Sequence, residues 1–373
     1  MERLKSPILF ITRTYPPVIG GMETLSYNLT QTISHLTPTF LIRNPYGRKA
    51  LPFFIPWATL KAIILIIFRK IKIVHLSDGV LAPIGVVIQF FFPQVRVVSN
   101  IHGLDLAYAE QLKLYHYTNL WAIRRLDKIL AVSREVENIC LEYGIDQQKI
   151  VVIPNGTDAK RYFDPAIKKQ KIATWQKFFP QIAKKVKLND SFILLSLGRI
   201  VKRKGLFWFV KEVMPYLPDK IILVIAGSGP DERKVREAVK YNKLDNRIFF
   251  LGFVNEEEKK ILLNTTDALI MPNLKIKGDR EGFGITAIEA GSCGLIPIVS
   301  ELEGLKDAVQ NEKNGLSLPS TDKQAFIETI KKLADNSDYC EKLSQKTRRF
   351  VSENFDWSII GEKYMTEFRK LEK

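Results

Sequence analysis

Two carboxylates stand eight residues apart in the segment Asp279–Ala290, and a glycine-rich turn lies between them. Glycines let a ligand approach the backbone closely, and the free N–H groups at the start of a helix bind anions. Glu289 lies one to two turns into the helix that follows Glu281. One carboxylate can then hold the hydroxyl groups of a sugar, and the other those of a ribose. The backbone beside the first is supplied by four residues: Gly282, Phe283, Gly284 and Ile285.

Two cations flank a short loop that directly follows another apolar run. Arg199 and Lys204 lie five residues apart in the segment Leu197–Gly205. Arginine can bind two phosphate oxygens at once and lysine acts as a point charge, so both can reach one diphosphate. Lys202 and Arg203, which lie between them, are expected to be solvated.

The first half of the chain holds two further turns that could meet a ligand. Gly20 and Gly21 lie between a predicted strand and a predicted helix, whose N-terminus could receive an anion. His102 follows the predicted strand Val95–Ser99, a position from which an imidazole can contact a ligand. His75 ends another strand and has a weaker case.

Several common cofactor and metal motifs are absent from the sequence. Neither G-x-G-x-x-G nor G-x-x-x-x-G-K-[ST] occurs, which argues against a dinucleotide site and excludes a P-loop nucleotidase. The three cysteines form no C-x-x-C pair, and the four histidines show no H-x-x-x-H spacing. We therefore expect no metal site and no bound cofactor.

The elements that would position these residues are short apolar runs, each followed by a turn and a helical stretch. Continuous apolar runs are typical of parallel strands with helices on both faces of the sheet. Two sets of alternating strands and helices predict two doubly wound α/β domains, 1–170 and 171–356, with a lysine-rich boundary near 165–190. Ligands should bind at the carboxyl ends of the strands. The predicted strands are Ile8–Thr12, Ile73–Leu76, Val95–Ser99, Lys128–Val132, Val151–Ile153, Phe192–Ser196, Ile221–Ile225, Ile248–Leu251, Ala268–Met271 and Ile296–Val299.

Positive charge is concentrated in the first half of the sequence. Of the 56 basic and 40 acidic residues, positions 1–187 hold 26 and 12, a net of +14, and positions 188–373 hold 30 and 28, a net of +2. This asymmetry indicates an anionic partner, which could be nucleic acid, a phospholipid surface or a phosphorylated substrate.

The most apolar segment, Leu51–Lys72, lies in this basic half. Its run Ala62–Phe68 is predicted to be a core helix. The preceding part, with Phe53, Phe54 and Trp57, is predicted to be a loop at an anionic membrane. The run Ala62–Phe68 is the longest uninterrupted apolar one, and it is short of the roughly 20 residues that cross a bilayer. The chain start shows no secretory signal, so we expect a cytoplasmic protein, peripheral at the inner face of the membrane.

The ordered set of motifs is similar to that of the retaining GT-B glycosyltransferases of family 4, over nearly the whole chain. The most specific element is the E-x7-E block, Glu281 to Glu289. The other matching pieces, in order, are Gly20-Gly21, Ile73–His75, His102-Gly103, Ala131–Ser133, Val152–Asp158, Gly198-Arg199, Lys204-Gly205, Ala226–Pro230 and Phe250–Gly252.

The resemblance implies two Rossmann-like domains facing a cleft, with the acceptor on the first and a nucleotide-sugar on the second. It also implies that the last helix, 357–373, crosses back to the first domain. The sequence gives that helix an apolar stripe of Ile359, Ile360, Tyr364, Met365 and Phe368.

Residue roles follow from the same resemblance. Arg199 and Lys204, with Gly20 and Gly21, are implied to contact the donor diphosphate. Glu281 and His102 are implied to act at the donor sugar. The resemblance places Glu289 on the ribose, Gly282–Ile285 in the sugar pocket, and the backbone of Phe253 and Val254 at the nucleobase.

The implied reaction moves a hexose-type sugar from a nucleoside-diphosphate sugar to a glycan or lipid-linked acceptor, with retention of configuration and without a metal ion. Such a reaction would serve cell-envelope polysaccharide or glycolipid synthesis. The loop Ser300–Asp307 departs from the family's usual glycine pair. The alternatives are a sugar-nucleotide epimerase or a phosphorylase on the same fold. From a different class, a basic nucleic-acid-binding protein is the rival, although no nucleic-acid-binding signature occurs and we expect no nucleic-acid partner.

Overall fold

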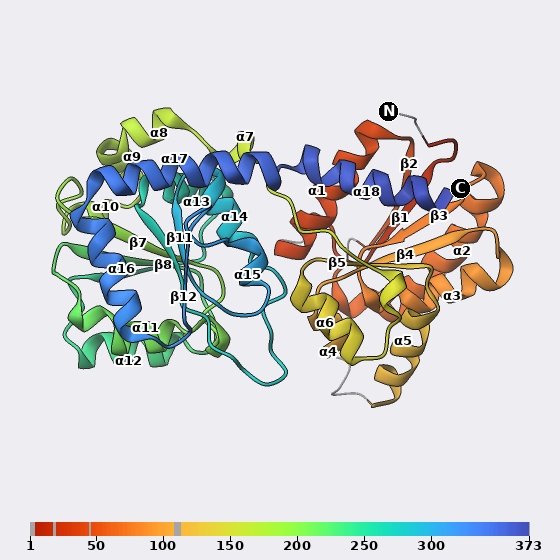
Figure 1. Ribbon diagram of the computed structural model, residues 1–373, viewed down its shortest axis with the longest axis horizontal. Coiled ribbons are helices and arrows are strands. Elements are labelled where there is room, and N and C mark those ends of the chain that lie inside the picture. Colours follow the sequence, from red (N-terminus) through yellow and green to blue (C-terminus); the bar gives the residue numbers. More distant parts are fainter. Residues whose placement is uncertain (1–3, 18–19, 45, 108–112, 373) are drawn as a thin grey trace. The chain divides into compact units, whose positions relative to one another are not determined.

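The chain forms two compact units, described here from a computed structural model (Figure 1). The structure describes residues 4–17, 20–44, 46–107 and 113–372, so Val18 and Ile19 of the predicted glycine turn lie outside the described residues. One unit consists of Met1–Gly156 with Trp357–Lys373, and the other of Thr157–Asp356.

The N-terminal unit is a parallel sheet in the order β2-β1-β3-β4-β5-β6. Its strands are β1 (Ile8–Thr12), β2 (Thr39–Arg43), β3 (Ile73–Leu76), β4 (Arg96–Ile101), β5 (Lys128–Ala131) and β6 (Ile150–Val152). Its helices are α1 (Gly21–Leu36), α2 (Leu51–Arg69), α3 (Ala82–Phe91), α4 (Leu104–Ala107), α5 (Lys113–Arg125), α6 (Arg134–Glu142) and α18 (Trp357–Glu372). In register, Ile8 lies between Thr39 on one side and Ile73 on the other.

The C-terminal unit repeats this architecture in the order β12-β11-β10-β7-β8-β9. Its strands are β7 (Phe192–Leu197), β8 (Ile221–Ala226), β9 (Ile248–Gly252), β10 (Ala268–Met271), β11 (Ile296–Ser300) and β12 (Leu316–Leu318). Its helices are α7 (Ala159–Tyr162), α8 (Pro165–Lys169), α9 (Lys171–Phe178), α10 (Pro180–Ala183), α11 (Leu206–Glu212), α12 (Glu232–Tyr241), α13 (Glu256–Thr265), α14 (Ile285–Ser292), α15 (Leu305–Ala308), α16 (Lys323–Asp335) and α17 (Ser337–Asn354).

Two doubly wound domains were predicted, and the fold is confirmed. Every residue of β1, β3, β8, β10 and β11 is buried, as expected for parallel strands covered on both faces. The strand order reverses between β1 and β3 in one sheet and between β7 and β10 in the other. Ligands bind at such reversal points in open parallel sheets. The turns after these four strands therefore hold the candidate sites.

Two strands, β2 and β12, were not predicted, and both lie at a sheet edge. β2 is half-buried over its first three residues, so its sequence lacks the fully apolar run of a central strand. β12 has only three residues.

The last helix belongs to the N-terminal unit, as predicted. Tyr364 and Phe368 of α18 lie edge-on to His75, with ring centroids 5.9 and 6.0 Å away, and Glu372 accepts hydrogen bonds from Ser6. The predicted apolar stripe is buried except for Ile359, which is exposed. Ile359 was therefore wrongly assigned to the stripe.

The boundary between the units lies at Gly156/Thr157 and not at 170/171. Helices α7 to α10 pack within the C-terminal unit, where Trp175 is fully buried and donates a hydrogen bond to Thr265. This boundary also changes the charge distribution. The N-terminal unit holds 21 basic and 13 acidic residues and the C-terminal unit 35 and 27, so each has a net charge of +8. The basic excess predicted for the N-terminal domain alone is therefore wrong.

The segment predicted to be a loop followed by a core helix is one helix, α2. Pro56 does not interrupt it, and Ile64, Ile67 and Phe68 are exposed instead of buried. α2 is long and apolar enough to cross a membrane by length and composition, with 22% of its most apolar window buried. The uninterrupted run Ala62–Phe68 understates this helix, because Thr59 and Lys61 divide its apolar residues.

Candidate active site

The loop after β7 places the two predicted diphosphate ligands in one small pocket. Arg199 and Lys204 both line this pocket, at the carboxyl end of β7. The loop closes at Gly205, which has φ of 67°. A Cβ there would lie 1.8 Å from the carbonyl oxygen of Pro272, so only glycine lets this loop pack on the loop that follows β10.

Glu281 lies in the loop after β10 and joins the cations of the β7 loop. Its Oε2 atom accepts hydrogen bonds from Lys204 Nζ at 2.5 Å and Asn273 Nδ2 at 2.9 Å, and it also pairs with Arg203. Arg203 donates a further bond to Asp279 at 2.9 Å. The Arg203 side chain is 11% exposed, so the prediction that it is solvated is wrong.

The charge of Glu281 is set by these neighbours. Burial alone would raise its pKa, but Lys204 and Arg203 more than offset that effect and lower the pKa to about 2. The carboxylate is therefore ionised at neutral pH and forms ion pairs with both cations.

The glycine turn presents the start of α14 beside this carboxylate. Gly284 caps α14 with φ of 93°, and Ile285 is its first residue, so the backbone from Gly282 to Ile285 leads directly into the helix. A Cβ on Gly284 would lie 2.5 Å from Leu305 Cδ2, which explains why the turn approaches α15 so closely. Phe283 is buried.

The loop Ser300–Asp307 contacts this site despite its unusual sequence. A carboxylate oxygen of Glu303 accepts from the backbone N–H of Glu281 at 2.5 Å, and the N–H of Gly304 donates to the Glu281 carbonyl at 3.0 Å. An acidic side chain thus fixes the backbone at Glu281.

Glu289 is buried in α14 and has partners that sequence reasoning missed. Lys259 Nζ donates to Glu289 Oε1 at 2.8 Å, and the Tyr162 hydroxyl donates to the same oxygen at 3.3 Å. Burial would lower the pKa of Lys259, but Glu289 more than offsets this and raises it. Burial raises the pKa of Tyr162, and Glu289 adds to that rise. No local sequence pattern indicates these contacts, because the partners Lys259 and Tyr162 lie 30 and 127 positions from Glu289.

Phe253 and Val254 follow the edge strand β9. Phe253 is largely exposed, and Val254 is half-buried. In the part of the chain that the structure describes, no backbone hydrogen bond forms at either residue. Their N–H and C=O groups are free to meet a ligand.

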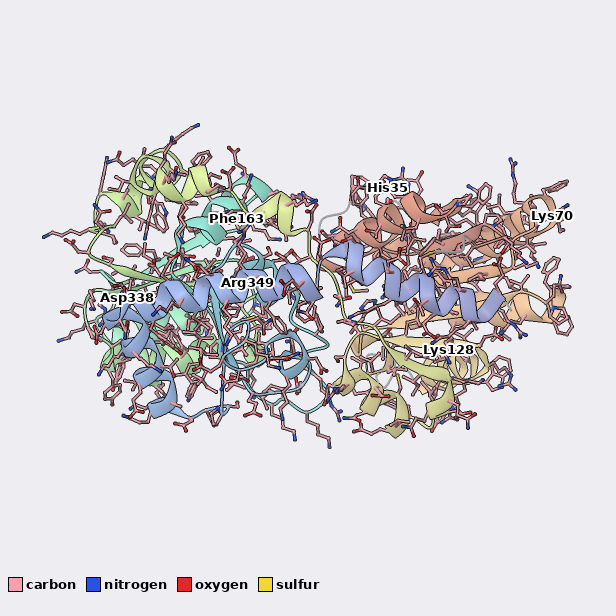
Figure 2. All side chains as sticks on the ribbon, turned by 45° about the horizontal axis from the view of Figure 1, so that its top comes forward. His35, Lys70, Lys128, Phe163, Asp338 and Arg349 are labelled. Atoms are coloured by element: carbon pink, nitrogen blue, oxygen red, sulfur yellow. The ribbon has the colours of Figure 1, made fainter. Side chains whose placement is uncertain are left out.

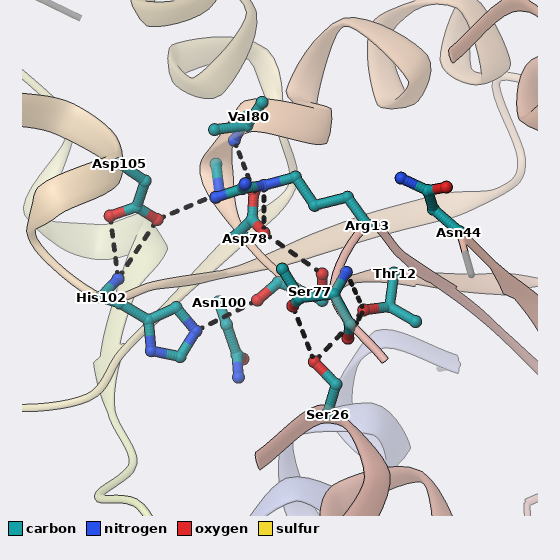
Figure 3. Close-up of polar contacts among 12 residues, drawn as sticks. Thr12, Arg13, Ser26, Asn44, Ser77, Asp78, Val80, Asn100, His102 and Asp105 are labelled. Atoms are coloured by element: carbon teal, nitrogen blue, oxygen red, sulfur yellow. Dashed lines mark hydrogen bonds and ion pairs between the residues drawn. The ribbon is translucent and has the colours of Figure 1, made fainter. Parts of the chain in front are cut away.

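In the N-terminal unit, His102 is held at the carboxyl end of β4 (Figure 3). Its Nε2 lies 3.1 Å from the Ser77 carbonyl oxygen, which can only accept, so Nε2 carries the proton. The backbone N–H of His102 donates to Asp105 at 3.0 Å, and Gly79 N–H donates to the same carboxyl group at 3.1 Å. Because Nε2 carries the proton, Nδ1 is the accepting nitrogen of the neutral imidazole. Burial raises the pKa of Asp105.

A buried ion pair joins the turn after β1 to the turn after β3. Arg13 contacts Asp78 at 2.7 Å, and Asp78 also accepts from the N–H of Val80 at 3.0 Å (Figure 3). The turns after β1, β3 and β4 are thus tied together around one small pocket. Its polar lining includes Thr12, Ser26, His75, Ser77, Asn100 and His102.

The paired glycines lie at the start of α1. Gly20 is the N-cap and Gly21 is the first residue of the helix. A Cβ on Gly20 would lie 2.3 Å from a carboxylate oxygen of Glu23, whereas the space beside Gly21 is open within 4 Å. A ligand can therefore approach the backbone at Gly21.

The predicted site residues divide between the two units. Gly20, Gly21 and His102 belong to the N-terminal unit, and the other predicted residues to the C-terminal unit. Among the residues that the structure describes, no group of three or more His, Cys, Asp or Glu side chains could hold a metal ion.

The two doubly wound units define a two-domain protein of the GT-B type. Residues 178–350 match the family model described as Glycosyl transferases group 1, and residues 31–161 match the one described as Glycosyltransferase Family 4. The chain belongs to the group 1, family 4 glycosyltransferases.

Relatives by sequence are glycosyltransferases. An uncharacterized glycosyltransferase of Methanocaldococcus jannaschii is 23% identical, over 97% of both chains. The UDP-Gal:alpha-D-GlcNAc-diphosphoundecaprenol alpha-1,3-galactosyltransferase of Escherichia coli is 27% identical, over 72% of this chain and 67% of that protein. The O-antigen chain mannosyltransferase C of Escherichia coli is 25% identical, over 75% and 70%.

Solved structures share the fold. HepE of Anabaena, determined with UDP and glucose, superposes with a TM-score of 0.75 at 16% identity, covering 98% of this chain and 100% of that one. Sucrose-phosphate synthase from Thermosynechococcus elongatus gives a TM-score of 0.77 at 19% identity, covering 98% and 99%.

Proposed function

We propose that this protein transfers a hexose-type sugar from a nucleoside-diphosphate sugar to a glycan or lipid-linked acceptor, with retention of configuration and without a metal ion. The observation that carries the proposal is the cluster of Arg199, Lys204 and Glu281 at the reversal point of the second sheet. Cell-envelope synthesis is the proposed setting, because the similar galactosyltransferase and O-antigen mannosyltransferase carry such names.

The cations are proposed to bind the donor diphosphate. Arg199 is exposed in the pocket, and Lys204 is held beside it by Glu281. The bond between the anomeric carbon and the diphosphate oxygen breaks, and the leaving group takes both electrons. Arg199 and Lys204 stabilise the charge that develops there, in the role that a divalent cation has in other enzymes. A phosphate oxygen of the leaving group then accepts the proton of the acceptor hydroxyl as the new glycosidic bond forms.

Other residues are proposed to orient the donor and the acceptor. Oε2 of Glu281 is occupied by three donors, so Oε1 is the atom proposed to accept from a sugar hydroxyl. Glu289 is proposed to bind the ribose, and the backbone of Phe253 and Val254 to bind the base. In the N-terminal unit, His102 and the glycine pair are proposed to contact the donor sugar and the phosphate.

The enzyme is proposed to work at the cytoplasmic face of a membrane and to contact an anionic lipid surface through its N-terminal unit. A lipid-linked acceptor would be held at such a surface.

The proposal is tested by product analysis with a panel of nucleotide-sugars in the presence of a chelator. We expect transfer with retained anomeric configuration, detected by NMR, and a loss of at least 100-fold in Lys204→Ala, as is typical when a donor to a developing charge is removed. Inverted product, or activity that requires an added divalent ion, would contradict it.

A further inference from the structure

Helix α2 carries two opposite apolar faces. Four residues of the helix are buried, and they recur at every fourth position: Phe54, Ala58, Ala62 and Ile66. Six large apolar side chains are exposed: Phe53, Trp57, Leu60, Ile64, Ile67 and Phe68. At 3.6 residues per turn these six fall within an arc of about 100°, on the side away from the buried stripe. An ordinary surface helix has polar residues on that side.

The exposure of this outward face is large. Phe53 is 82% exposed and Phe68 is 76% exposed, so both ends of the 19-residue helix present an aromatic ring to the surroundings. Helix α2 packs against α3 (Figure 1). The end of α3 adds Phe90 and Phe91, which are 79% and 60% exposed. Exposed apolar side chains in such number on two neighbouring helices mark an interaction site.

The charge of the surrounding sequence points to the partner. No acidic residue occurs from Thr24 to Ser77, a stretch that contains seven basic residues: Arg43, Arg48, Lys49, Lys61, Arg69, Lys70 and Lys72. Lys61 lies over the Trp57 ring at 4.8 Å, and Lys70 lies at the outer end of the helix (Figure 2). Because the two units have equal net charge, this acid-free stretch is the relevant feature, and not the charge of the unit as a whole.

The place of α2 in the fold limits the orientations in which it can bind a bilayer. α2 leads from β2 to β3, which lie on either side of β1 in one parallel sheet. Its buried stripe packs on the body of the same unit, where α2 contacts α3 and β2. A spanning orientation would remove that stripe from the fold. An orientation parallel to the membrane keeps the stripe buried and turns the outward face to the lipid.

We propose that the outward face of α2, together with Phe90 and Phe91, inserts into the interfacial region of an anionic phospholipid bilayer and lies parallel to its plane. The inference rests on the proposed function for its setting, a membrane-associated acceptor. The flanking lysines and arginines contact the lipid headgroups while the aromatic and aliphatic side chains enter the boundary of the acyl chains. Pairing of this face with a second copy would bring two sets of seven cations together, which opposes that alternative.

Vesicle sedimentation of the full chain tests the proposal. We expect wild-type protein to sediment with vesicles of equal phosphatidylglycerol and phosphatidylcholine, and at least tenfold less with phosphatidylcholine alone. The variant Phe53→Ser/Leu60→Ser/Phe68→Ser should bind anionic vesicles at least tenfold more weakly. The matched variant Ile172→Ser/Tyr216→Ser/Tyr241→Ser removes exposed apolar groups of the other unit and should bind as wild type does. Lys61→Glu/Lys70→Glu should reduce binding by more than tenfold, since each basic residue near the surface contributes about a factor of five.

Trp57 reports insertion directly. Brominated acyl chains should quench part of the wild-type tryptophan fluorescence, and Trp57→Phe should remove that part. No quenching, equal sedimentation of the Phe53→Ser/Leu60→Ser/Phe68→Ser variant, or a wild-type dimer that this variant converts to a monomer would each overturn the proposal. Calorimetric titration with UDP and GDP separates it from the proposed function. Loss of nucleotide binding with intact vesicle binding would contradict the proposed sugar transfer and leave the proposal for α2 standing. Intact nucleotide binding without vesicle binding would contradict the proposal for α2 and the proposed lipid contact, and would leave sugar transfer standing.

Discussion

Replacing Glu281 by Gln tests the electrostatics of the candidate site. In the native unit one carboxylate oxygen accepts from Lys204 and Asn273 and pairs with Arg203, and the pKa falls from 4.5 to about 2. A shift of this size corresponds to about 3 kcal/mol of stability at neutral pH. Because the Glu281 side chain is only 13% exposed, solvent screening reduces this value little. We expect Glu281→Gln to lower the free energy of unfolding at pH 7 by about that amount.

The pH dependence of the difference is the sharper test. A carboxylate whose folded pKa is lowered stabilises the fold fully above its unfolded pKa, here 4.5, and loses that contribution as the pH falls towards 2. At pH 3 about 2 kcal/mol of the contribution is already lost, so the difference between wild type and Glu281→Gln should shrink from about 3 to about 1 kcal/mol.

Urea unfolding at pH 7 and pH 3 measures both values. It is followed by tryptophan fluorescence, to which Trp175 and Trp208 of the C-terminal unit contribute. The exposed Glu257→Gln serves as the control and should match wild type at both pH values. A Glu281→Gln difference that stays the same from pH 7 to pH 3 would refute the ion-pair reasoning. The variant should also bind UDP at least as tightly as wild type, since both cations are released, while transfer falls by at least 100-fold.

Three further predictions concern other groups of the two units. Lys204→Ala should weaken UDP binding by about tenfold or more, because a charge-assisted contact to phosphate is lost. A calorimetric dissociation constant for UDP equal to that of wild type would count against this role of Lys204. Lys259→Met should raise the KM for the donor by about tenfold with little change in kcat, because Glu289 loses the ammonium that orients it; Tyr162→Phe should have a smaller effect, and equal effects would disprove this ranking. Burial lowers the pKa of His75 from 6.5 to about 4, so the N-terminal unit should lose about 3 kcal/mol as the pH falls from 6.5 through 4. Acid titration of His75→Phe should lack this loss, and an unchanged acid transition would exclude His75 as its source.

The fold and the proximity of Lys204 to Glu281 were predictable because they rest on local patterns. Ten apolar runs gave the strands that position the site, and the turns after β7 and β10 placed Lys204 and Glu281 at neighbouring strand ends. The stripe of α18 was likewise visible as apolar residues at helical spacing, apart from Ile359.

The partners of the site residues were less predictable, since they depend on contacts between distant segments. Arg203 lies in a run of three cations that is typical of a solvated loop, yet Glu281 and Asp279, more than 70 positions away, draw it into the cluster. Lys259 lies in the first turns of α13, next to three glutamates, and the sequence there does not indicate that it is the partner of Glu289.

The apolar segment of the N-terminal unit shows the limit of reading hydropathy without a fold. Composition alone did not reveal that α2 is continuous through Pro56, nor that only every fourth residue is buried. The charge asymmetry was likewise misplaced, because the lysine-rich stretch before β7 folds with the C-terminal unit.

Titration calorimetry of UDP and GDP in the presence of EDTA tests the central claim most directly. Wild-type protein should bind one of these nucleotides without any divalent ion, and Arg199→Ala/Lys204→Ala should abolish that binding. The double variant should remain folded by circular dichroism but be less stable than wild type, because the buried Glu281 carboxylate loses Lys204. Binding that appears only when magnesium or manganese is added, or that persists in the double variant, would contradict the claim that these two side chains hold the diphosphate.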